Sequence, residues 1–184
     1  MDIRPTAIPD VRLVVPVRKR DARGFLYEVY RRGDLEAAGL PCDFVQENHV
    51  VSERPGTVRG MHFQGPPDAQ DKLVRVVRGR TLDVALDLRR SSPMFGRHVA
   101  AELSADNGHQ LLIPKGFAHG FCTLEPHTEV VYKATNYHSP ERSYGVLWSD
   151  PALGIKWPVD ATSAVMSDAD RARPRLCDLP AFFD

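Results

Sequence analysis

The chain has 184 residues, of which 42% are hydrophobic and 26% charged, and its 24 basic and 24 acidic residues cancel. This size and composition are typical of one globular domain with a sizeable core, so we expect a single domain over residues 1–184. A net charge of zero gives no reason to expect a nucleic acid or an anionic membrane as partner.

The cysteines and the N-terminus indicate the compartment. Cys42, Cys122 and Cys177 lie far apart and follow neither a CxxC nor a zinc-binding spacing, which favours a reducing compartment. Prolines and charges interrupt the first twenty residues, so no signal peptide is predicted there. No apolar run approaches the ~18 residues that a membrane span needs. We therefore expect a cytoplasmic protein.

Short β-branched runs separated by turn residues begin the chain, which is typical of antiparallel strands. A short helix is predicted over residues 33–38, which are polar, alanine-rich and followed by Gly39. Strands are predicted here over residues 11–17, 25–30 and 44–52. The third strand places Gln46 and Asn48 on one face. This pattern fits a polar cavity, and a solvated sheet edge would show it too.

The stretch from Gly56 to Gln64 is predicted as a buried strand, although it carries Arg59, His62 and Gln64. Gly60 lies inside this strand and predicts a β-bulge, which would turn Arg59 and His62 toward the same cavity despite their odd spacing. Further strands are predicted over residues 72–78, 81–88, 96–103, 110–113, 120–124, 129–135 and 145–148.

About ten short strands and almost no helix predict an all-β fold. The strand over 81–88 alternates apolar and polar residues with a period of two and is joined to its predecessor through Gly79. A short late helix is predicted near Ser167, a suitable N-cap. The best fit is a double-sheet jelly roll with short peripheral helices.

Two spaced motifs, Gly56 with His62, and Gly108 with Pro114, Gly116 and His119, resemble those of the cupin superfamily. The resemblance implies that the jelly roll is a double-stranded β-helix, the cupin jelly roll. Most cupins use such histidines to bind a metal. Here Gln64 stands where a second histidine is usual, and no glutamate follows at the right distance. Two histidines fall short of the three or four ligands of a catalytic metal, so we predict no metal and no cofactor. A metal-dependent cupin dioxygenase is the alternative that this argument disfavours.

Without a metal, the site is expected to work by proton transfer. His62 is the natural base, because histidine titrates near neutrality, although a histidine satisfied in the core is the plainer alternative. Lys72 could stabilise an oxyanion or be a solvated strand end. Tyr132 could donate a proton or simply pack. A base, a cation and a phenol in one barrel favour epimerisation next to a carbonyl.

The residues now reached resemble the dTDP-4-dehydrorhamnose 3,5-epimerase family from about residue 23 to 176. The matching motifs, in family order, are Phe44-Val-Gln-Glu-Asn48, Arg59-Gly-Met-His-Phe-Gln64, Lys72-Leu-Val-Arg-Val-Val-Arg-Gly79, Pro114-Lys-Gly-Phe-Ala-His-Gly120, Val131-Tyr-Lys133 and Asp150-Pro-Ala-Leu-Gly-Ile-Lys-Trp-Pro158.

The resemblance implies a metal-free cupin that inverts C3 and C5 of dTDP-4-keto-6-deoxy-D-glucose. It implies His62 as base, Asp170 as the residue that orients it, and Tyr132 as acid. Lys72 and His119 would surround the sugar. The implied substrate contacts are Arg23, Glu28, Gln46, Asn48 and Arg59. Family members are homodimers that exchange a strand, so Arg23 is expected to serve the partner's site.

Some positions depart from the family pattern and concern the nucleotide contacts more than the proton chemistry: Leu26, Met61, Ser143, Tyr144 and Ala169. Two alternatives therefore stay open. One is a mono-epimerase acting at C3 or C5 only, as in some antibiotic-sugar pathways. The other is a sugar-binding cupin without catalysis, which the intact set of predicted catalytic residues disfavours.

Overall fold

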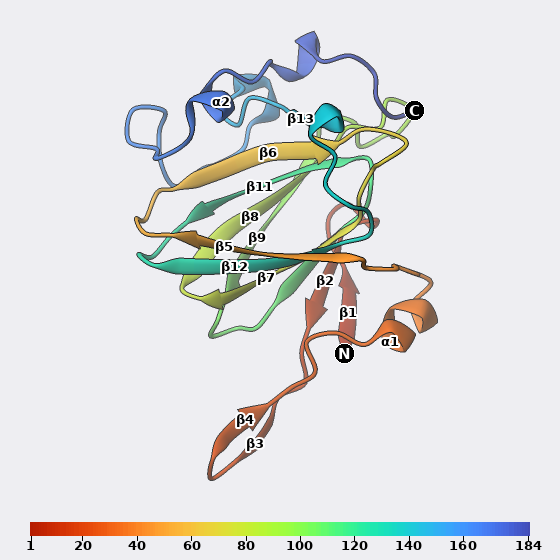
Figure 1. Cartoon of the computed structure of the whole chain (residues 1–184), viewed down its shortest axis with the longest axis vertical. Coiled ribbons are helices and arrows are strands. Elements are labelled where there is room, and N and C mark those ends of the chain that lie inside the picture. Colours follow the sequence, from red (N-terminus) through yellow and green to blue (C-terminus); the bar gives the residue numbers. More distant parts are fainter.

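A computed structural model describes residues 1–184, and its thirteen strands form a six-stranded sheet, a five-stranded sheet and a separate two-stranded hairpin. The two large sheets face each other (Figure 1). All named strand pairs are antiparallel. The predicted all-β jelly roll with short peripheral helices is therefore confirmed.

The six-stranded sheet contains, in spatial order, β1 (Asp2–Pro5), β2 (Arg12–Val15), β10 (Gln110–Ile113), β7 (Lys72–Arg78), β12 (Thr128–Ala134) and β5 (Gln46–Ser52). The five-stranded sheet contains β13 (Ser143–Gly145), β6 (Val58–Gln64), β11 (Phe117–Thr123), β8 (Arg80–Asp87) and β9 (His98–Ser104). The order places β7 beside β12, and because the two sheets face each other, residues of β6 can approach residues of these two strands.

Helical structure is brief. The α-helices are α1 (Arg32–Ala37) and α2 (Asp168–Arg171), and the 3-10 helices are η1 (Pro140–Arg142), η2 (Pro151–Leu153) and η3 (Leu176–Asp178). The predicted cap is confirmed, because the Ser167 hydroxyl accepts a hydrogen bond from the Asp170 amide. None of these helices has the length and apolar character needed to cross a membrane.

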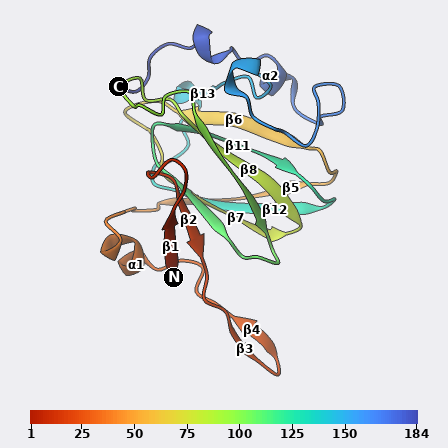
Figure 2. The same cartoon turned by 180° about the vertical axis from the view of Figure 1, so that it is seen from behind.

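The N-terminal hairpin of β3 (Lys19–Asp21) and β4 (Gly24–Leu26) projects away from the two sheets (Figure 2). The strand expected over 25–30 was too long, since β4 pairs only with β3 and has no further neighbour to extend it. Likewise, β13 ends at Gly145, short of the predicted 148. By contrast, β7 and β10 begin and end as predicted.

The core has three parts. One lies between the sheets and another between the five-stranded sheet and the C-terminal segment, which Figure 1 shows crossing that side of the fold. The third includes Leu35 of α1 together with Leu73 and Leu112 of the six-stranded sheet. Both faces of the five-stranded sheet are thus covered, which explains why every residue of β11 is buried.

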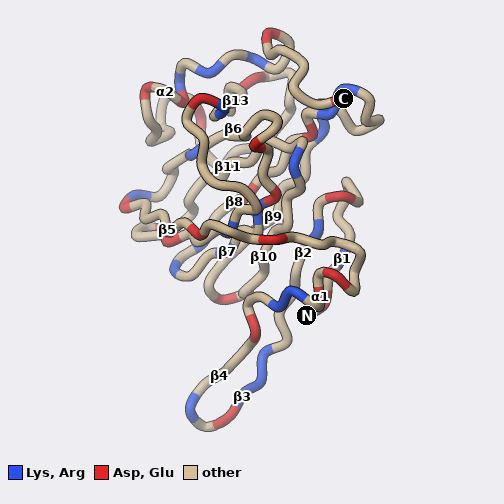
Figure 3. The backbone as a smooth tube through the Cα atoms, turned by 45° about the vertical axis from the view of Figure 1, so that its right-hand side comes forward, with Lys and Arg blue, Asp and Glu red and all other residues tan.

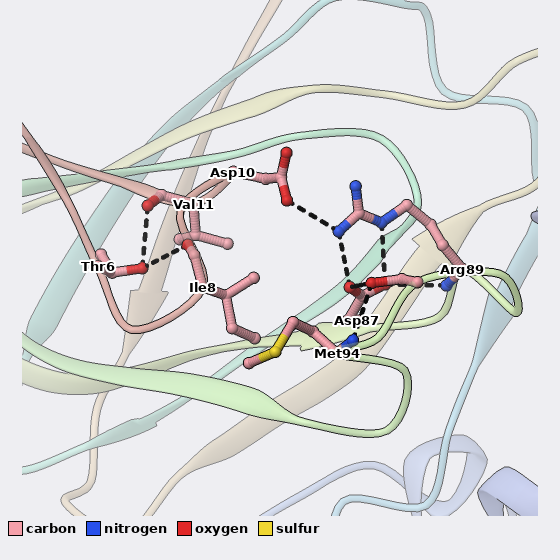
Figure 4. Close-up of polar contacts among 8 residues, drawn as sticks. Thr6, Ile8, Asp10, Val11, Asp87, Arg89 and Met94 are labelled. Atoms are coloured by element: carbon pink, nitrogen blue, oxygen red, sulfur yellow. Dashed lines mark hydrogen bonds and ion pairs between the residues drawn. The ribbon is translucent and has the colours of Figure 1, made fainter.

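In strand β8, which lies in the covered five-stranded sheet, both the apolar and the polar sides of the alternating pattern are buried. The polar residues of the alternating pattern are not solvated, because Thr81, Asp83 and Asp87 are all 0% exposed. Asp87 accepts from Arg89 Nη2 at 2.7 Å, and the same guanidinium reaches Asp10 at 3.0 Å (Figure 4). Burial raises the pKa of Asp87, but the hydrogen bonds from Arg89 outweigh this and lower it overall.

Candidate functional site

The site begins with neighbouring strands β6 and β11, where His62 and His119 are register partners. The register shifts between this pair and the next, Arg59 with Phe121, so the bulge predicted at Gly60 is confirmed. Gly60 has φ +137°, and a Cβ there would lie 2.5 Å from the Gly120 Cα, so only glycine fits.

The bulge turns residues three apart toward one side. Val58 and Met61 both pack in the core beneath the C-terminal segment, so Arg59 and His62 share the opposite side. The Arg59 charge acts on Tyr132, which lines a cavity together with His62. Arg59 is anchored by donating from Nε to the Ser52 hydroxyl at 3.2 Å. Arg59 and His62 therefore share one side of β6, but Arg59 is not among the residues that line the cavity, so the prediction that both face one cavity is confirmed only for the side of the strand.

His62 is held by a carboxylate from the far end of the chain. Its Nε2 lies 2.6 Å from Asp170 Oδ1, and the Asp170 side chain is 9% exposed. Burial raises the pKa of Asp170, yet the hydrogen bond and charge of His62 outweigh burial and lower it overall. Because Nε2 is occupied, Nδ1 is the ring nitrogen left to exchange a proton with a bound molecule.

The cavity in front of His62 has a volume of about 200 Å³. Its lining contains His62, Phe63, Gln64, Gln70, Lys72, Tyr132, His138, Ser143 and Arg173. The lining is predominantly polar and carries no free carboxylate, so it suits a ligand with oxygen acceptors and developing negative charge. Arg173, which the sequence did not suggest, has a buried Nε without a hydrogen-bond partner, 3.9 Å from Asp170 Oδ1.

Lys72 and Tyr132 come from adjacent strands, β7 and β12, and the Lys72 ammonium lies 5.8 Å from the Tyr132 ring centroid. Burial lowers the pKa of Lys72 to about 8, and the Asp83 charge opposes part of that shift. Burial also raises the pKa of Tyr132, against the opposing charge of Arg59. At neutral pH the cavity therefore offers an ammonium and a protonated phenol.

A second histidine–carboxylate pair lies beside the first. His119 Nε2 is 2.9 Å from Asp83 Oδ1, both residues are buried, and Asp83 Oδ2 has no partner. Sequence reasoning did not single out Asp83. No local signal marked it, because the alternation along β8 gives Asp83 the position of a solvent-facing residue, and only the structure shows that this side is buried and that the carboxylate has a partner there.

The side chains at the positions of the cupin metal ligands already make hydrogen bonds to other protein groups. Each of the two histidines engages a carboxylate through Nε2. Gln64 uses its amide on backbone groups of neighbouring loops. No group of three or more His, Cys, Asp or Glu side chains is arranged to hold a metal ion. This donor set does not reach the ligand number of a catalytic metal site.

The expected substrate contacts divide into two groups. Gln46 and Asn48 lie on edge strand β5, share a face as expected, and are joined by a 3.1 Å hydrogen bond, with Asn48 opposite Tyr132. Arg23 and Glu28 lie in and just after the projecting hairpin. Their side chains are 90% and 60% exposed, and the hairpin points away from the sheets that carry His62 (Figures 1 and 2).

Comparison with known proteins agrees with this geometry. The family model for dTDP-4-dehydrorhamnose 3,5-epimerase matches residues 5–178. The chain belongs to the dTDP-4-dehydrorhamnose 3,5-epimerase family. This isomerase family is the one that the sequence motifs resembled, and the resemblance is thereby confirmed.

Individual members of the family match nearly the whole chain. The dTDP-4-dehydrorhamnose 3,5-epimerase of Sinorhizobium fredii is 45% identical over 183 residues, which cover 100% of this chain and 93% of the relative. The Bacillus anthracis enzyme, solved with TDP and PPi bound, superposes with a TM-score of 0.91 at 48% identity, covering 95% of this chain and 98% of the other. A Legionella pneumophila epimerase, in complex with dTDP-4-keto-L-rhamnose, has a TM-score of 0.92 at 38% identity, covering 98% and 95%.

The departures from the family pattern occupy different surroundings. Met61 is fully buried in the core, and Tyr144 packs on Phe182 with ring centroids 4.2 Å apart. Ser143 lines the cavity, whereas Ala169 is exposed on α2 beside Asp170. Of these four, only Ser143 lines the cavity and only Ala169 is exposed.

Proposed function

We propose that this protein inverts C3 and C5 of dTDP-4-keto-6-deoxy-D-glucose to give dTDP-4-dehydro-L-rhamnose. The observation that carries the proposal is the His62–Asp170 pair, which shares one cavity with Lys72 and Tyr132 in a chain of this family. The Legionella relative, bound to dTDP-4-keto-L-rhamnose, supports the choice of substrate class.

The proposed chemistry follows from the groups around the cavity. His62 removes the proton from a carbon next to the C4 ketone, and the pair of electrons moves onto the ketone oxygen as an enolate. The Lys72 ammonium stabilises that oxygen. Tyr132 returns a proton to the opposite face of the same carbon, which inverts it. Exchange with solvent then restores the phenol and the neutral imidazole.

Asp170 is proposed to orient His62 and to stabilise the imidazolium that forms. His119 and Arg59 are proposed to contact the sugar nucleotide from the adjoining wall. The cavity of about 200 Å³ is smaller than the roughly 300–1,000 Å³ of sites for drug-sized ligands. It accordingly takes the sugar ring, and the nucleotide extends beyond it toward β5, where Gln46 and Asn48 lie.

We also propose a cytoplasmic homodimer in which the hairpin of one subunit completes the site of the other. The hairpin exposes Phe25 and Leu26 at 49% and 68%, apolar surface that a second subunit would cover. Arg23 at its tip is one of several charged residues there (Figure 3) and would reach the partner's bound substrate. The three free cysteines fit a reducing compartment.

Mixed dimers test this arrangement. His62→Ala and Arg23→Ala each impair a different part of one composite site, so mixing the two inactive variants should restore one intact site in each mixed dimer. Activity that stays absent after subunit exchange, or a monomer by sedimentation, would contradict the proposal.

Turnover is tested with a coupled assay. The keto-sugar nucleotide is incubated with the protein and with the partner reductase that accepts only the L-configured product. Formation of dTDP-L-rhamnose by the wild type but not by His62→Ala is the expected result. A wild-type protein that binds the substrate and forms no product would instead support a sugar-binding cupin without catalysis.

A further inference from the structure

The segment Asn136–Ser139 joins β12 to η1 and has no regular secondary structure. Nevertheless, a glutamine side chain holds the backbone of each of its four residues. The four bonds are Gln70 Nε2 to Asn136 O at 2.7 Å, Gln64 Nε2 to Tyr137 O at 2.9 Å, His138 N to Gln46 Oε1 at 2.9 Å and Ser139 N to Gln64 Oε1 at 2.9 Å. We call these three side chains the glutamine clamp.

Gln64 is the central member of the glutamine clamp. It is 5% exposed, lies two residues after His62 on β6, and makes two of the four bonds. A further bond from its Nε2 reaches Asp68 O in the β6–β7 connection. The amide therefore uses donor and acceptor together, and it ties two other parts of the chain, the Asn136–Ser139 segment and the β6–β7 connection, to the strand that carries the base.

The other two members come from elsewhere. Gln46 belongs to edge strand β5, and Gln70 to the connection that leads into β7 and Lys72. Gln46 also donates a hydrogen bond from Nε2 to Asn48, so both the nitrogen and the oxygen of its amide have partners. The clamp thus joins β5, β6 and the entrance to β7 at the segment that immediately follows β12, the strand of Tyr132.

The exposed backbone groups of the segment do not themselves require the clamp. Tyr137 and His138 are exposed, so water could satisfy their backbone groups at no cost in side-chain order. What the clamp achieves instead is a fixed position for His138, which lines the cavity with His62 and Tyr132. An irregular exposed segment without such ties would open locally.

We propose that the glutamine clamp is a positioning device for the substrate site and that Gln64 is its principal positioning residue. It fixes the Asn136–Ser139 wall and so sets the affinity for the sugar nucleotide, while the proton-transfer groups keep their places without it. The inference rests on the proposed function, because it assumes that the cavity at His62 is the substrate site.

Gln64→Met tests the proposal, because it removes donors and acceptor but keeps an unbranched side chain of similar length. We expect KM for the sugar nucleotide to rise about tenfold and kcat to stay within about threefold of wild type. Backbone hydrogen exchange at Ser139, whose amide loses its acceptor, should quicken by about tenfold. If Gln64→Met does not fold, Gln70→Met removes the bond to Asn136 and should raise KM in the same direction.

Asn107→Leu is the matched control. Asn107 also ties a turn with three bonds, accepting from Ser104 N and His109 N and donating to Glu102 O, but it lines no part of the cavity. We expect this variant to keep the wild-type KM.

An unchanged KM in Gln64→Met, or an equal rise in Asn107→Leu, would overturn the proposal. A kcat loss as large as the KM effect would do the same. If the wild type itself shows no turnover, the proposed function fails, and exchange at Ser139 still decides whether the clamp holds the segment.

Discussion

Asp170→Asn isolates the charge of the carboxylate that orients His62. Asparagine has nearly the same shape, and its carbonyl oxygen can still accept from His62 Nε2, where Asp170 Oδ1 now lies at 2.6 Å. What disappears is the negative charge beside the imidazolium that forms when His62 takes the substrate proton. Because the carboxylate is buried, solvent replaces little of that stabilisation.

The size of the loss follows from the strength of the bond. A hydrogen bond to a charged group contributes about 1.5–3 kcal/mol, which corresponds to a fall in kcat of roughly 10- to 150-fold. Removing the base itself in His62→Ala should cost more, about 10²–10⁴-fold or beyond. The loss of kcat in Asp170→Asn should be smaller than the loss in His62→Ala, because Asp170 acts through His62 and does not itself accept the proton.

The assay is the initial rate of product formation at saturating substrate, with melting temperatures recorded for each variant. Asp150→Asn is the control. Asp150 is also a buried carboxylate of the C-terminal part, but it accepts from Ala152 N and Leu176 N and does not touch His62. We expect its kcat to stay near wild type. An Asp170→Asn enzyme with full activity, or a control that loses as much, would refute the reasoning.

Three further variants probe the other groups. Tyr132→Phe should lower turnover by about 10²–10⁴-fold while exchange of the substrate α-proton, followed by NMR, continues, because the base survives; retained turnover would exclude Tyr132 as the acid. Lys72→Met should abolish turnover but raise the melting temperature at pH 7. Burial lowers the pKa of Lys72 from 10.5 to about 8, so below pH 8 the charged lysine destabilises the folded state. The gain in melting temperature of Lys72→Met should therefore be largest below pH 8 and shrink between pH 8 and 10.5. No gain at pH 7 would contradict the burial argument. Ala169→Lys should tighten dTDP by about fivefold in calorimetry, since one charge–phosphate contact contributes about 1 kcal/mol, and unchanged affinity would count against that contact.

The sequence predicted the strands best where turn residues confine them. Gly79 closes β7 and Pro114 follows β10, and both strands begin and end as expected. The strand at Phe25 was predicted too long because β-propensity reports how well a residue suits a sheet, and here the chain leaves the sheet after Leu26. Alternation along β8 did not reveal that its polar side is also buried, since that side faces the six-stranded sheet and the packing of one sheet on another is a tertiary feature.

In the candidate site, too, the local sequence pattern pointed to some residues, whereas others depend on tertiary contacts. Spacing and residue type pointed to His62 and predicted the bulge at Gly60, but they left Lys72 open between a buried cation and a solvated strand end. Asp170 lies 108 residues from its partner, and only the family resemblance pointed to it. Asp83 and the bonds of Gln64 depend on which loops and strands meet in space, and no local pattern in the sequence encodes those meetings.

The most direct test of the central claim is isotope exchange. The keto-sugar nucleotide is incubated with the protein in D₂O and followed by proton NMR, with His62→Ala as the control. Our account predicts deuterium at both C3 and C5 with the wild type and at neither carbon with the variant. Label at one carbon only would mean a mono-epimerase, and a wild-type protein that introduces no label would contradict catalysis on this substrate.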